Sequence, residues 1–180
     1  MFNDGRSKRV VFLAHCLLNQ NAISDGTAVY PAAFREVIDY FLNKDIGIVQ
    51  MPCPEFCCLG LDRGDPAGAS RPVVEENTRI RAAMQTGQAA KRLSQLADDV
   101  VRQIRAYHDH SFAVLGVIGA NRSPNCGVET TSARDMEVSG KGLFMEAVAQ
   151  GLAREGITVP MLGLKSTDDL IKKLDQFLNL

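Results

Sequence analysis

Four short apolar runs alternate with longer amphipathic stretches along this chain, and this alternation constrains the fold more than any other feature. The runs lie at about residues 10–14, 46–51, 112–118 and 158–164. They are mostly apolar rather than alternating, as expected for parallel strands that are covered on both faces. The strand–helix order predicts an α/β fold: one Rossmann-like three-layer sandwich over residues 1–180, with about four parallel strands and helices on both faces.

The amphipathic stretches have apolar residues at helical spacing. The predicted helices cover residues 30–43, 89–107, 141–154 and 167–178. Ser166 or Thr167 is the expected cap of the last helix, because a hydroxyl can accept a hydrogen bond from an unpaired N–H group of the first turn. Residues 59–73 are rich in Gly, Pro and Asp and predict a long loop, and a helix over 72–85 is expected to cover the site beside it.

Charge and composition exclude several function classes. The net charge of −1 and the 11 aromatic residues, with no Trp, provide no basic and aromatic surface for nucleic acid. The apolar run after the basic N-terminal residues is short and interrupted by His15, so it predicts a strand rather than a signal peptide. No apolar run is long enough for a membrane span. We therefore expect a cytoplasmic protein whose five cysteines do not form a disulfide framework.

Three of these cysteines each follow a predicted strand: Cys16, Cys53 and Cys126. The carboxyl ends of parallel strands share one edge of a sheet, and ligands bind in the crevice outside that edge. A structural zinc site normally has four protein ligands. Three thiols at this edge are one ligand short, so they predict a metal centre with one vacant coordination position. The alternative is that each cysteine packs as a small buried hydrophobe.

Other residues near these positions have two interpretations each. Adjacent side chains point apart, so Cys57 and Cys58 are not both expected at one centre, although Cys57 could be an additional nearby thiol. His15 could donate a hydrogen bond to a ligand sulfur, or lie at the strand end without a role. Three arginines are candidate substrate anchors or solvated loop cations: Arg63, Arg71 and Arg122.

The segments around the three thiols resemble motifs of the 2-thiouracil desulfurase family. They are CLLNQNAISDG at 16–26, CPE at 53–55 and RSPNCG at 122–127, where family members carry CLLG…DG, CPE and RSPSCG in the same order. The resemblance implies a [4Fe–4S] cluster held by Cys16, Cys53 and Cys126, with the fourth iron open to the sulfur of a substrate. By the same resemblance Glu55 is the catalytic acid/base, and Ser123 assists at the substrate or the departing sulfur.

Departures from the family motifs lie where a substrate ring would be contacted. Asn125 replaces the family's Ser, Ala22, Ile23 and Ser24 replace a basic-aromatic pair, and the second motif is extended to CPEFCCLGLDRG. These differences indicate a divergent desulfurase (desulfidase) for a small thiolated molecule, such as a thio-base, and not necessarily 2-thiouracil.

Two other functions fit the same cysteines. The protein could hold a cluster or metal without catalysis, as a sensor or carrier. It could also be a metal-free enzyme that uses Cys53 or Cys126 as the nucleophile.

Overall fold

The computed structural model describes residues 2–179 and confirms the predicted α/β class. Four strands form one parallel sheet in the order β2-β1-β3-β6. They are β1 (Arg9–Leu13), β2 (Gly47–Gln50), β3 (Ala113–Ala120) and β6 (Met161–Leu164). Each lies within two or three residues of its predicted run. Val11, Phe12 and Leu13 of β1 are fully buried, which explains why this strand is a continuous apolar run.

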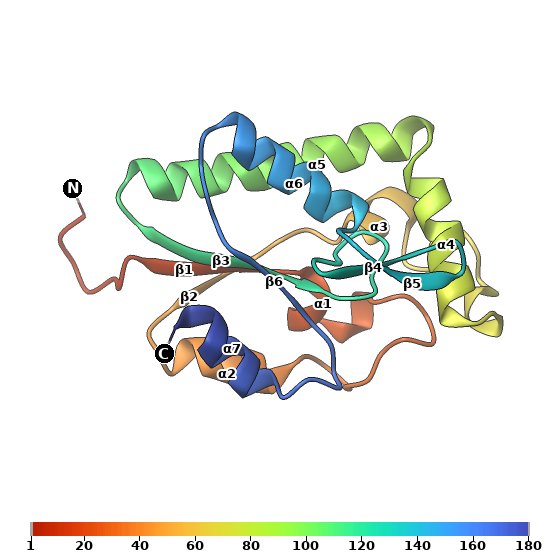
Figure 1. Cartoon of the computed structure of the whole chain (residues 1–180), viewed down its shortest axis with the longest axis horizontal. Coiled ribbons are helices and arrows are strands. Elements are labelled where there is room, and N and C mark those ends of the chain that lie inside the picture. Colours follow the sequence, from red (N-terminus) through yellow and green to blue (C-terminus); the bar gives the residue numbers. More distant parts are fainter. Residues whose placement is uncertain (1, 180) are drawn as a thin grey trace.

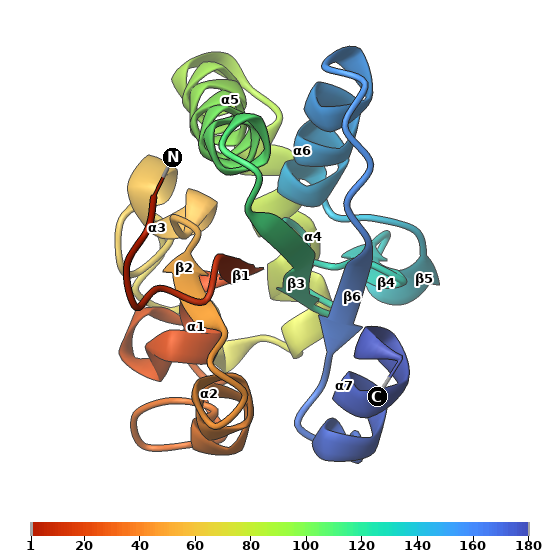
Figure 2. The same cartoon turned by 90° about the vertical axis from the view of Figure 1, so that its left-hand side faces the viewer.

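Two pairs of helices complete a three-layer sandwich (Figures 1 and 2). One face of the sheet is covered by α5 (Gly87–Asp109) and α6 (Leu143–Arg154), and the other by α2 (Arg35–Leu42) and α7 (Leu170–Leu178). Apolar residues of α5 at helical spacing are buried in the core: Leu93, Leu96, Val100 and Ile104. Among residues 2–179, no helix is long and apolar enough to cross a bilayer.

The carboxyl edge of the sheet carries several shorter elements (Figure 1). Directly after β1 and β2 come the short helices α1 (His15–Leu18) and α3 (Pro54–Leu59). The predicted covering helix is present as α4 (Val73–Met84), and the loop before it contains the 3₁₀ turn η2 (Gly68–Ser70). Another 3₁₀ turn, η1 (Gln20–Ala22), follows α1. These elements surround the edge at which the three cysteines were predicted to meet.

Three expectations differ from the structure. The helix predicted from residue 30 begins only at Arg35, after a loop that follows Pro31. The cap of α7 is Asp169, whose carboxylate accepts from the Lys172 N–H group, and not Ser166 or Thr167. An antiparallel hairpin that the sequence pattern did not predict, β4 (Thr130–Ala133) with β5 (Met136–Ser139), follows Cys126.

Candidate functional site

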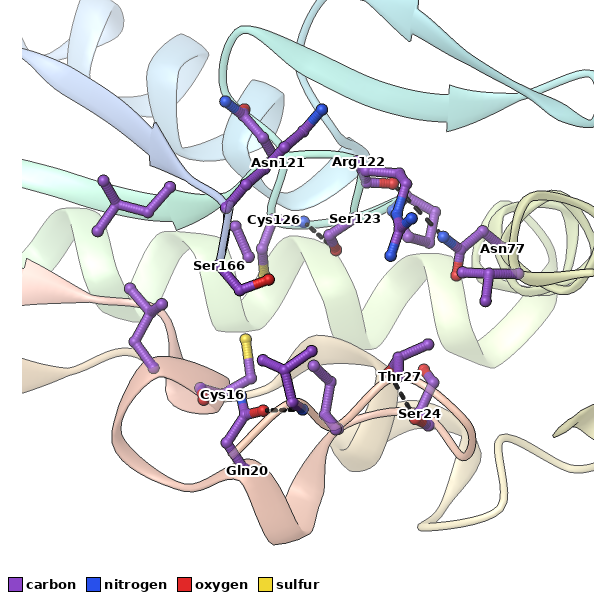
Figure 3. A pocket seen from close by; sticks show the side chains of 18 of the residues that line it. Cys16, Gln20, Ser24, Thr27, Asn77, Asn121, Arg122, Ser123, Cys126 and Ser166 are labelled. Atoms are coloured by element: carbon purple, nitrogen blue, oxygen red, sulfur yellow. Dashed lines mark hydrogen bonds between the residues drawn. The ribbon is translucent and has the colours of Figure 1, made fainter. Parts of the chain in front are cut away.

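The three cysteines that follow strands line one cavity of about 380 Å³ at the carboxyl edge of the sheet. Cys16 lies in α1 after β1, Cys53 is the residue before α3, and Cys126 lies in the loop after β3. Because β1 lies between β2 and β3 in the sheet, the three thiols come from adjacent strands. Figure 3 shows the side chains of Cys16 and Cys126 entering from opposite walls, with their sulfur atoms turned toward each other.

Local contacts fix the Cys126 loop against the sheet. The Ala120 N–H group donates to the Cys126 carbonyl over 2.9 Å. A Cβ atom on Gly119 would stand 2.1 Å from that carbonyl oxygen, so only glycine allows this approach. The Ser123 hydroxyl oxygen accepts from the N–H groups of Cys126 (2.9 Å) and Asn125 (3.3 Å). Ser123 is therefore a turn residue that lines the cavity, and its O–H can donate to the Cys126 sulfur, which acts to lower the pKa of that thiol.

The environment of the cavity raises the pKa of all three thiols. Burial is the main cause in each case; it raises the pKa of Cys16 to about 12 and that of Cys53 to about 11. The pKa of Cys126 is also raised, by burial and then by the other two thiols. At neutral pH these groups are protonated in the absence of a cation, and the thiolate is the form that acts as nucleophile or metal ligand.

We expect the three cavity thiols of the metal-free protein to react slowly with iodoacetamide at neutral pH, because alkylation needs the thiolate. Exposed Cys57 should be modified first. Mass spectrometry of peptides after timed quenching would measure both rates. Rapid modification of Cys53 or Cys126 would instead favour the metal-free nucleophile.

Glu55 is buried in the wall of the same cavity and accepts three hydrogen bonds. Oε2 accepts from Ser24 Oγ (3.1 Å) and from Arg63 Nε (3.1 Å), and Oε1 accepts from Asn125 Nδ2 (3.0 Å). The three donors come from the first, second and third motif segments, so this carboxylate connects all the cysteine loops. Asn125, which replaces a Ser of the family motif, has an amide long enough to make that contact.

The structure separates the remaining candidates. Cys57 is exposed and, with half-buried Cys58, lines a different pocket beside α5, so neither thiol lines the cavity of the other three. His15 Nδ1 accepts from Gln50 Nε2 over 2.7 Å, while its Nε2 is buried without a partner among the described residues.

The three candidate anchoring arginines also have different surroundings. Arg63 is buried and paired with Glu55, so it is neither a solvated cation nor a free anchor. Arg71 pairs with Asp65 of its own loop and with Glu76 of α4, and it does not line the cavity. Arg122 is exposed and lines the cavity.

The loop after β6 contributes cavity residues that the motifs did not indicate. Lys165, Ser166 and Thr167 line the cavity, and Figure 3 shows the Ser166 hydroxyl pointing into it. Asp168 holds this turn closed by accepting from the Lys165 N–H group over 2.8 Å. The sequence contained one signal for these three residues: they directly follow the last strand, which ends at the same edge of the sheet as the other three strands.

Among residues 2–179, no three His, Cys, Asp or Glu side chains are grouped so that they could hold one metal ion. A cubane iron–sulfur cluster does not need such convergence, since each cysteine binds a different iron atom. The three free thiols, which come from three loops around one cavity, are the type of donor that such a cluster takes.

Comparisons with known proteins assign no activity. No family model matches this chain, and no solved structure does. An uncharacterized protein of Methanocaldococcus jannaschii is 25% identical over 123 residues, which make up 68% of this chain and 70% of that protein.

Proposed function

We propose that this protein is an iron–sulfur-dependent desulfurase that replaces the sulfur of a small thiolated molecule with oxygen. The observation that carries this proposal is the presence of three free thiols and a buried carboxylate, Glu55, in the wall of one cavity. The resemblance to the 2-thiouracil desulfurase family points to the same residues. The reaction consumes one water and releases one hydrogen sulfide, so it needs no external oxidant or reductant.

Cys16, Cys53 and Cys126 would hold a [4Fe–4S] cluster. Their raised pKa values mean that the cluster irons must displace a proton from each thiol, which makes assembly easier at higher pH. When bound, such a cluster supplies an open iron that acts as a Lewis acid toward sulfur. The cysteines provide three ligands, which leaves one iron for the substrate.

Two side chains act on the substrate in this proposal: Glu55 moves protons, and Ser123 donates a hydrogen bond. Glu55 takes a proton from the water that attacks the thiocarbonyl carbon, and it returns a proton to the ring nitrogen or the departing sulfur. Its three hydrogen bonds fix the direction of its oxygens before a substrate arrives. Ser123 donates its O–H to the substrate while its oxygen continues to hold the turn before Cys126.

The remaining walls of the cavity favour a small and partly apolar substrate. Most of the exposed lining is apolar, and its volume is in the range of small-molecule sites. The apolar side chains of the lining are Leu17, Ile23, Val29, Phe34, Val73, Ala120, Pro124 and Leu164. A thiolated base is of this size and polarity, with polar edges that can meet Ser166 and Asn77 of the lining.

Anaerobic reconstitution with ferrous iron and sulfide tests the proposal. We expect about four irons and four acid-labile sulfides per chain, absorbance typical of a [4Fe–4S] cluster, and sulfide release from one or more members of a panel of thiolated bases. Replacing Cys16, Cys53 or Cys126 with Ser should greatly reduce the iron content. Cys57→Ser is the matched control, because that thiol is exposed in a separate pocket, and it should load normally.

Two results would contradict this function. One is a colourless, iron-free protein that releases sulfide at the full rate. The other is iron binding that is lost with Cys57→Ser but unaffected by the three cavity variants.

A further inference from the structure

Arg63 is almost completely buried although it lies in the polar loop between α3 and α4. It is 2% exposed, and its backbone adopts φ of 56°, in the left-handed region that non-glycine residues seldom occupy. The Arg79 guanidinium donates to the Arg63 carbonyl over 2.9 Å and helps to hold this conformation. The loop is therefore built to turn this side chain inward.

Every N–H group of the Arg63 guanidinium has an acceptor. Nε donates to Glu55 Oε2 over 3.1 Å. Nη1 donates to the carbonyls of Gly60 and Leu61 over 3.0 and 2.9 Å. Nη2 donates to the Ala22 carbonyl over 2.5 Å and to the Cys53 sulfur over 3.8 Å. A guanidinium has five N–H donors, so none is left for a substrate.

A buried ion pair is not required for stability, because well-packed apolar residues can often replace one at little cost. The Arg63 guanidinium contacts both the sulfur of Cys53, a proposed cluster ligand, and Glu55, the proposed acid/base. These two contacts from one side chain suggest a role in the chemistry. Hydrogen bonds to cluster sulfurs and nearby positive charge are means by which proteins set the reduction potential of such clusters.

We propose that Arg63 is a positioning residue that acts on both halves of the site: it sets the potential of the cluster through the Cys53 sulfur and orients Glu55 through Nε. This inference rests on the proposed function. The N–H donor and the positive charge both stabilise the more negative, reduced form of the cluster. Loss of either should lower the reduction potential.

Potentiometric titration followed by EPR tests this in two variants. Arg63→Lys keeps the charge but cannot reach both partners, and Arg63→Gln also removes the charge. We expect the midpoint potential to decrease in the order wild type, Lys, Gln, with iron content retained and kcat reduced more than KM is changed. Arg71→Lys, in the same loop but paired with Asp65 and Glu76, is the matched control and should match wild type.

The outcomes distinguish the two proposals. A wild-type protein that assembles no cluster overturns the proposed function. A wild-type cluster whose potential and EPR spectrum are the same in both Arg63 variants overturns the role of Arg63 alone.

A measurement on the wild-type protein keeps the inference testable if the variants do not fold. With ¹⁵N-labelled arginine, pulsed EPR of the reduced cluster should detect a weak ¹⁵N coupling. Arg122→Lys should retain this coupling, which excludes the other arginine of the lining as its source. Absence of any coupling in the wild-type cluster would contradict the N–H···S contact.

Discussion

Glu55→Gln is expected to lower the rate of sulfide release by at least about 100-fold, because general acid–base catalysis typically contributes this much or more. An amide has nearly the same shape as the carboxylate but cannot take a proton from water. The cluster itself should survive, since Glu55 is not one of its proposed ligands. Sulfide release under anaerobic turnover and the cluster absorbance of the same samples would measure the two effects separately.

The hydrogen bonds around Glu55 allow this substitution without unfolding. The Gln oxygen can accept from Ser24 and Arg63, while its NH₂ group would face Asn125. The Asn125 Oδ1 atom is buried and has no partner among the described residues, so a flip of this amide would supply the missing acceptor. Undiminished turnover by Glu55→Gln would remove Glu55 from the mechanism. A stable cluster without turnover of any thiolated compound, even in the wild type, would favour the sensor or carrier function.

Arg63→Met is expected to cost about 3–5 kcal/mol in the free energy of unfolding, because it leaves the Glu55 carboxylate buried without its ion pair. Adding Glu55→Gln should recover part of this loss, since the second change removes the unpaired charge. Urea unfolding of the metal-free protein under reducing conditions would measure both variants and their coupling.

Arg71→Met provides the comparison for this loss. Its guanidinium is partly exposed, and Glu76 retains Arg79 as a partner when Arg71 is removed. The loss should therefore be much smaller than for Arg63→Met. Equal losses in the two arginine variants, or no recovery in the double variant, would show that the buried pair has no special energetic importance.

The sheet was predictable from sequence because its strands are buried on both faces, but the β4–β5 hairpin was not. Its strands are short and include polar residues such as Thr130 and Glu137. The turn between them places Arg134 and Asp135 at φ of 54° and 56°. Asn and Gly normally mark such a turn, so neither the strands nor the turn had a local signal.

The site was predictable to the extent that it follows from topology. Cys16, Cys53 and Cys126 were placed at one edge because each follows a parallel strand, and they line one cavity. The environment of Arg63 depends on contacts with Ala22, 41 positions earlier in the chain. The residues next to Arg63 in the sequence do not indicate such a contact. The sequence therefore cannot distinguish a buried arginine from a solvated loop cation at this position.

The order of the strands also has a consequence for how the protein matures during synthesis. Cys16 and Cys53 are translated early, but Cys126 follows β3, which comes after the long helix α5. Pairing of β1 with β3 spans most of that intervening chain, and long-range pairing of this kind forms late because closing a long loop costs entropy. A group held by all three thiols can therefore be inserted only after β3 and the loop that follows it have been made. Iron delivery to a nascent chain that ends before β3 would find only two of the three ligands.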